Sequence, residues 1–122
     1  MNLEFLKEKG FDSETLRVLE ISLHFLDTYF GHDIDKGSEL MKSFFDNHGD
    51  RYDEDLIHER SSYKMSAAIH YYEFLKGENS GYGEWMQTNG HFHPPAEAFE
   101  YFRENYFDIY RDNPMKKFPF KN

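Results

Sequence analysis

The sequence contains no cysteine, which excludes disulfide bonds and cysteine-ligated metal sites. It also lacks a basic segment followed by an apolar run at its start, and no stretch approaches the length of a membrane span. The absence of cysteine fits a reducing compartment. We therefore expect a soluble, cytoplasmic protein that has no membrane partner and needs no cofactor.

Clustered positive charge is missing from most of the chain. The 122 residues include 14 Lys and Arg against 23 Asp and Glu, which gives a formal net charge of −9. Residues 111–122 carry four Lys and Arg against one Asp, or +3, so residues 1–110 must carry −12 to reach that total. Nucleic acids and anionic membranes are bound by grouped cationic side chains, so neither is expected as a partner. A domain this acidic attracts basic proteins, although a net charge of this size also keeps a protein in solution.

Apolar periodicity and helix-ending glycines divide the chain into helices. The predicted helices cover residues 3–9, 13–30, 33–48, 53–77 and 94–110. A glycine-rich connection over 77–93 contains the single tryptophan, Trp85, which is expected to pack onto the core. Residues 1–110 are predicted to form one α-helical domain, and the proline-containing residues 111–122 a basic tail that is extended or disordered.

The longest predicted helix, residues 53–77, reads as one uninterrupted element. Asp53 is suited to cap its start and Gly77 to end it. Its apolar residues cover about half of the circumference, which requires neighbours on two sides. The sequence therefore predicts an all-α fold, a single-domain bundle of four to five helices around this long central helix. The remaining arc is a polar stripe that is expected to face solvent, made of Asp55, Glu59, Ser62, Ser66 and Glu73.

Two histidine patterns suggest a metal site, but neither has the spacing of a complete one. His70 and Glu73 lie one helical turn apart, whereas a di-metal bundle also needs carboxylate and histidine ligands on partner helices. His91 and His93 lie in a predicted loop, where they suit an adventitious ion. We predict no metal and no enzymatic activity, and a metal-assisted helical hydrolase remains an alternative.

Carboxylates concentrate just before the central helix and in its first turns. Residues 46–59 hold six Asp and Glu against Arg51 as the one Lys or Arg. Small side chains farther along the polar stripe would let a partner approach, and a tyrosine beside the charge would anchor it. The predicted partner-binding residues are Asp50, Tyr52, Asp53, Glu54, Asp55, Glu59, Ser62, Ser66 and Glu73. The alternative is a solvated face whose acids favour the helix dipole.

Residues 52–55 (YDED) and 65–72 (MSAAIHYY), in a small, acidic, cysteine-free helical protein, resemble immunity proteins of bacterial polymorphic-toxin and contact-dependent growth inhibition systems. Such proteins bind a cognate toxin domain, often a basic nuclease, and block its active site. The resemblance implies a cytoplasmic inhibitor that acts without catalysis. A further alternative is an adaptor module that oligomerises through its aromatic residues.

Overall fold

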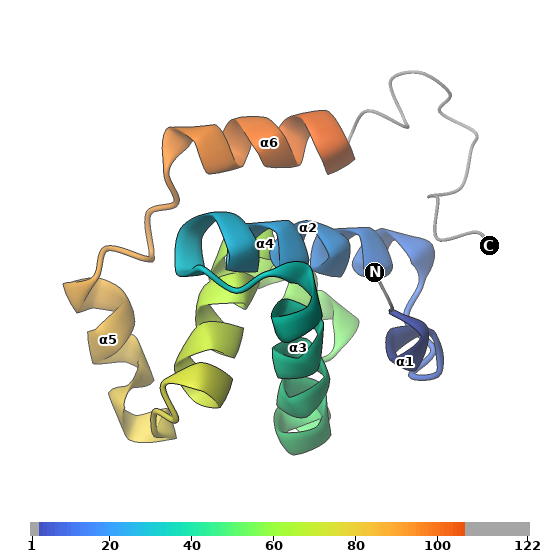
Figure 1. Cartoon of the computed structure of the whole chain (residues 1–122), viewed down its shortest axis with the longest axis horizontal. Helices are drawn as coiled ribbons and strands as arrows, with labels where there is room; N and C mark the ends of the chain where they lie inside the picture. Colours follow the sequence, from blue (N-terminus) through green and yellow to red (C-terminus); the bar gives the residue numbers. More distant parts are fainter. Residues whose placement is uncertain (1–2, 107–122) are drawn as a thin grey trace.

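The computed structural model describes residues 3–106, and this part of the chain contains helices and no strand (Figure 1). The α-helices are α1 (Glu4–Lys7), α2 (Ser13–Phe30), α3 (Ile34–His48), α4 (Glu54–Ile69), α5 (Tyr82–Thr88) and α6 (Ala96–Tyr106). Short 3₁₀ turns precede α4 and α5, and a π-helical turn, His70–Phe74, continues α4. The all-α prediction is confirmed. The predicted tail, residues 111–122, lies outside the described residues.

Aspartates fix the starts of the three long helices α2, α3 and α4. The side chains of Asp12, Asp33 and Asp53 each accept a hydrogen bond from a backbone amide of the first turn, over 2.8 to 2.9 Å. These caps satisfy amides that have no partner within the helix. At the end of α2, Gly31 adopts a left-handed conformation with φ 77°, which a residue with a Cβ rarely adopts.

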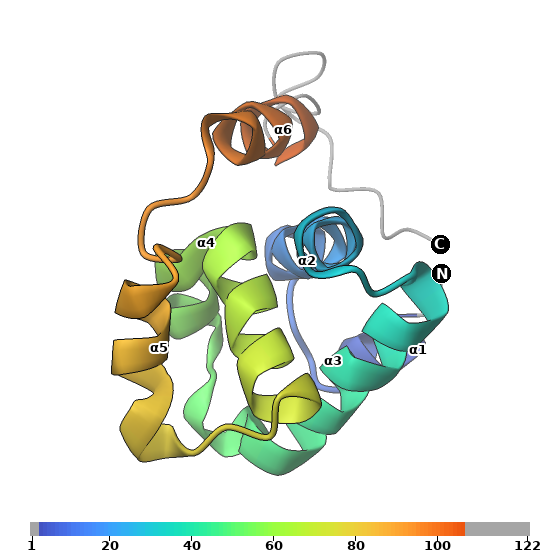
Figure 2. The same ribbon diagram turned by 60° about the vertical axis from the view of Figure 1, so that its left-hand side comes forward.

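The pair of helices α2 and α4 forms the centre of the bundle, and the two run in the same direction. Their contacts follow the same order along both chains: Asp12–Glu54, Thr15–His58, Ser22–Ser62 and His32–His70. Helix α3 therefore returns the chain to the starting end of α2 and packs against both helices (Figure 2). No helix among residues 3–106 is long and apolar enough to cross a membrane.

The uninterrupted helix predicted over 53–77 is wrong, because α4 breaks at Ser61. Ser61 has φ 68° and ψ 178°, a region that is essentially restricted to glycine. The break turns the next residue, Ser62, toward α2, where its hydroxyl donates to the Val18 carbonyl over 2.7 Å. The predicted helix departs from α-geometry again at the π-helical turn.

Helix α6 closes the bundle on the other side of α2 (Figure 1). Ala98 is its buried residue and belongs to an apolar cluster with Phe25 of α2 and Tyr63 of α4. The Tyr101 ring stacks on His24 of α2, with the ring centres 3.9 Å apart. These contacts hold α6 beside the break in α4 and leave a groove between them.

Candidate binding surface

An acidic surface forms where α2 and α4 begin, because the shared direction of the two helices brings both starts to one end of the molecule. We define it as Asp12, Asp53, Glu54, Asp55 and Glu59. The Asp12 amide donates to the Glu54 carboxylate over 2.6 Å and joins the two helix starts directly. Asp53, Asp55 and Glu59 are exposed, and within residues 3–106 no cation lies at ion-pair distance from them.

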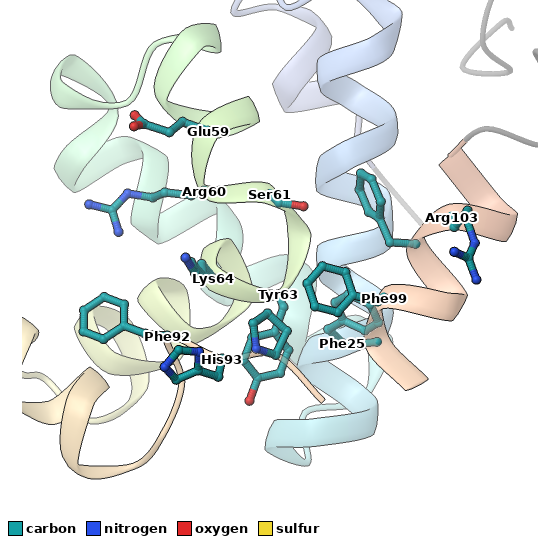
Figure 3. A pocket seen from close by; sticks show the side chains of 13 residues that line it. Phe25, Glu59, Arg60, Ser61, Tyr63, Lys64, Phe92, His93, Phe99 and Arg103 are labelled. Carbon is teal, nitrogen blue, oxygen red and sulfur yellow. The ribbon is translucent and has the colours of Figure 1, made fainter. Parts of the chain in front are cut away.

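Beside Glu59 lies an apolar groove of about 840 Å³, bounded by the break in α4, the segment 92–94 and α6 (Figure 3). Its apolar lining consists of Phe25, Tyr63, Ala98, Phe99 and Phe102, and charged side chains of both signs, Glu59, Arg60, Lys64 and Arg103, border it. Phe99 is 62% exposed and Phe92, at the opposite side, is 41% exposed. Large apolar side chains left open to water at a groove are typical of a surface that binds another molecule.

The break at Ser61 links the groove to the acidic surface. Ser61 lines the groove, and Glu59 belongs both to the groove and to the acidic surface. Strained backbone of this kind persists where the surrounding structure holds it and is common at functional sites. An apolar centre bordered by charged side chains is the arrangement found in protein–protein interfaces.

The predicted partner-binding residues divide into an exposed set and a buried set. Asp50, Asp53, Asp55 and Glu59 are exposed and Glu54 is partly exposed, so these five remain candidates. The predicted exposure of the other four is wrong, and they are Tyr52, Ser62, Ser66 and Glu73. The polar stripe assumed a straight helix, whereas the break at Ser61 turns the following residues inward.

Each of the four buried residues has a structural partner. Ser62 and Ser66 donate to backbone carbonyls, of Val18 and Tyr63 respectively. The ring of Tyr52 packs edge-on against Phe44, with ring centres 4.8 Å apart. The Glu73 carboxylate accepts from the side-chain amide of Asn47. None of the four is available to an external protein in this conformation.

Sequence reasoning missed the groove and the contribution of Asp12. The position of Asp12 beside Glu54 depends on the direction of α2 relative to α4. Phe99 is exposed, although an apolar residue in a helix of a bundle is usually buried. No local pattern shows which apolar residues remain uncovered after the helices pack.

The two histidine patterns do not form one site, because His70 and His91 make hydrogen bonds with different neighbours. His70 Nδ1 lies 2.9 Å from His32 Nε2, and His91 Nδ1 lies 2.9 Å from the Tyr63 hydroxyl. Burial, with smaller effects of His32 and His91, lowers the pKa of His70 to about 4, so this ring is neutral at pH 7. Among residues 3–106, no three His, Asp or Glu side chains are grouped as metal ligands.

Comparison with known proteins finds no match among protein-family models, curated proteins or solved structures. The resemblance of residues 52–55 and 65–72 to immunity proteins therefore stays a prediction.

Proposed function

We propose that this protein is an immunity-type inhibitor that binds a basic toxin domain, such as a nuclease, and occludes its active site without catalysis. One observation carries the proposal: the exposed carboxylates at the paired starts of α2 and α4 continue through Glu59 to an apolar groove with two exposed phenylalanines. Charge draws a basic partner to this surface, and burial of Phe92 and Phe99 then slows its dissociation.

The inhibitory mechanism is occlusion by charge mimicry. A nuclease cleft is lined by cations that bind the phosphates of its substrate. Asp53, Asp55 and Glu59 would take the place of those phosphates, and rigid helix starts would hold them in position. Since long-range attraction between charges is screened by ions, the association rate should fall steeply as salt is added.

A charge-reversal experiment tests this proposal. The double substitution Asp55→Lys and Glu59→Lys should abolish the protection of cells that express the cognate toxin, with candidate toxin domains taken from neighbouring genes. The control substitution, Glu39→Lys with Glu84→Lys, makes the same charge change at exposed residues of α3 and α5. Circular dichroism should show that both variants remain folded. Full protection by the Asp55 and Glu59 variant would exclude this surface.

A second candidate is an adaptor that associates with itself, and the exposure of Phe92 and Phe99 favours it. Light scattering separates the two functions, because an inhibitor of this kind is expected to be a monomer when purified alone. A dimer that becomes monomeric on Phe99→Ser would favour the adaptor. The earlier alternative, a metal-assisted hydrolase, would require stoichiometric metal in the purified protein and loss of activity on His70→Ala.

A further inference from the structure

A smaller pocket, of about 360 Å³, lies between the start of α4, the π-helical turn and α5. Its main lining residues are Arg51, Tyr52, Arg60, Tyr72, Asn79 and Tyr82. Two arginines thus share a pocket walled by three tyrosines, in a protein whose net charge is −9. Neither the acidic surface nor the proposed toxin contact accounts for this concentration of guanidinium groups.

Arg60 is held between aromatic rings, and within residues 3–106 no carboxylate pairs with it. Its side chain points away from Phe25 and Phe99 of the groove (Figure 3), and its guanidinium carbon lies 5.4 Å from the ring centre of Tyr52 and 5.3 Å from that of Tyr82. Nη1 donates to the Tyr82 hydroxyl over 2.8 Å. Nε is buried, and within residues 3–106 it has no hydrogen-bond partner. A buried donor without a partner destabilises the folded protein.

Arg51, the second cation, is kept separate from the nearest buried carboxylate. Its Nη2 donates to His48 Nδ1 over 2.8 Å, so the proton of a neutral His48 is on Nε2. That atom faces the Glu73 carboxylate at 3.6 Å, and Asn47 also donates to Glu73. His48 therefore stands between Arg51 and Glu73, and the exposed guanidinium of Arg51 lacks a carboxylate partner in the described part of the chain.

The three tyrosines supply uncharged hydroxyls and flat apolar walls. Burial raises the pKa of Tyr82 to about 12 and also raises the pKa of Tyr52 and Tyr72, so all three remain neutral at pH 7. The Tyr72 and Tyr82 rings stack with their centres 5.3 Å apart and their planes 17° apart. Neutral hydroxyls carry no charge that would repel an anion, and the flat rings can contact a planar group.

We propose that this pocket binds a small molecule carrying a phosphate group, with the phosphate held by Arg51 and Arg60 and the organic part against Tyr72 and Tyr82. A phosphate monoester carries about −1.5 to −2 charges and three acceptor oxygens, which suits two guanidinium forks better than a single carboxylate does. The volume of about 360 Å³ admits a small molecule. This site is additional to the proposed inhibitory surface.

Titration of the ¹⁵N-labelled full chain tests the site, with the Nε–H resonances of its arginines as the readout. The probes are phenyl phosphate, inorganic phosphate and benzoate, at constant ionic strength. Phenyl phosphate should shift the Arg60 resonance in a saturable way. Arg60→Met and Arg51→Met should each weaken its binding by about tenfold or more, since each removes a charge-assisted hydrogen bond. Arg103→Met, at an exposed arginine of α6 paired with Glu100, should leave binding unchanged.

The outcomes separate the possible ligands. Equal binding of phenyl phosphate and inorganic phosphate assigns the site to free phosphate, and tighter binding of phenyl phosphate assigns it to an aromatic phosphate. Binding of benzoate as tightly as phenyl phosphate would overturn the assignment to phosphate. An unshifted Arg60 resonance, or full affinity in Arg51→Met, would overturn the site itself. Arg51 is exposed, so the Arg51 variant keeps the test valid even if Arg60→Met unfolds.

Discussion

The hydroxyl of Ser62 on α4 donates a 2.7 Å hydrogen bond to the backbone carbonyl of Val18 on α2. Ser62 is fully buried between the two helices, where Ser22 donates in turn to the Ser62 carbonyl over 3.0 Å. A small hydroxyl therefore sets how closely the two central helices approach. This contact also places Ser62 in the core and not on the polar stripe that the sequence predicted.

Enlarging Ser62 should destabilise the protein more than shortening it. Ser62→Ala removes one hydrogen bond and should cost about 1 kcal/mol of unfolding free energy. Ser62→Leu overfills the contact and should cost about 1–3 kcal/mol. Urea denaturation measures both, with Ser80→Leu at an exposed turn as the control. Unchanged stability of Ser62→Leu would show that the residue faces solvent.

Replacing Ser61 with glycine should stabilise the protein, although Ser61 lies within a helical segment. At φ 68° and ψ 178° a side chain is strained, and removing it should recover about 1 kcal/mol. Ser61→Ala keeps the Cβ atom and should leave the stability near that of the wild type. In a regular helix the order would be reversed, because alanine there is favoured over glycine by about 0.5–1 kcal/mol. Thermal unfolding of the two variants distinguishes a broken α4 from a continuous one.

Substitution by alanine should lower the free energy of unfolding at Gly77 and raise it at Gly83. A Cβ at Gly77 would overlap the ring of Tyr71, which is fixed by a 2.7 Å hydrogen bond from its hydroxyl to the Glu78 carbonyl. Gly77→Ala should therefore cost about 1–3 kcal/mol. A Cβ at Gly83 meets no atom within 4 Å, and its position in α5 suits alanine. Gly83→Ala should stabilise by about 0.4–1 kcal/mol, as measured by chemical denaturation.

Acid should destabilise the protein in part through His70. The pKa of this ring is lowered from 6.5 to about 4, so between these two pH values the unfolded chain binds a proton that the folded protein does not. Stability contributed by neutral His70 is complete above pH 6.5 and is lost as the pH falls toward 4. His70→Phe should therefore show a smaller fall in melting temperature over this window than the wild type.

The matched control for His70 is exposed His93, and His93→Gln should retain the full pH dependence. Burial lowers the pKa of the neighbouring His32 and His91 as well, so part of the wild-type dependence should remain in His70→Phe. An identical pH dependence in the wild type and His70→Phe would contradict the burial of this ring among Phe30, Phe74 and Trp85.

Local features of the fold could be predicted from sequence because their causes are local. The caps at Asp12, Asp33 and Asp53 involve residues three positions apart, and the stop at Gly31 is a property of that residue. Trp85 packs against His70 and Tyr71, as expected for a tryptophan that holds the connection over 77–93 onto the core, although it lies on a helix, α5, and not in a loop. Such features require no knowledge of how the helices are arranged.

The break at Ser61 could not be predicted, because no glycine or proline marks it. It is held by the contact of Ser62 with Val18, 44 positions earlier in the chain. The pocket that contains Arg51 and Arg60 could not be predicted for a similar reason. Arg51 and Arg60 precede Tyr82 by more than a helix length in sequence, and only the turn after α4 brings α5 back beside them.

The shared direction of α2 and α4 also bears on how rapidly the chain folds. Every side-chain hydrogen bond described between the two segments joins residues 38 to 44 positions apart. An antiparallel hairpin of helices would form its first contacts next to a short turn, at a smaller entropic cost of loop closure. Here the chain must pass through α3 before α4 can pack against α2. The slowest folding step should therefore be the docking of α4 onto α2.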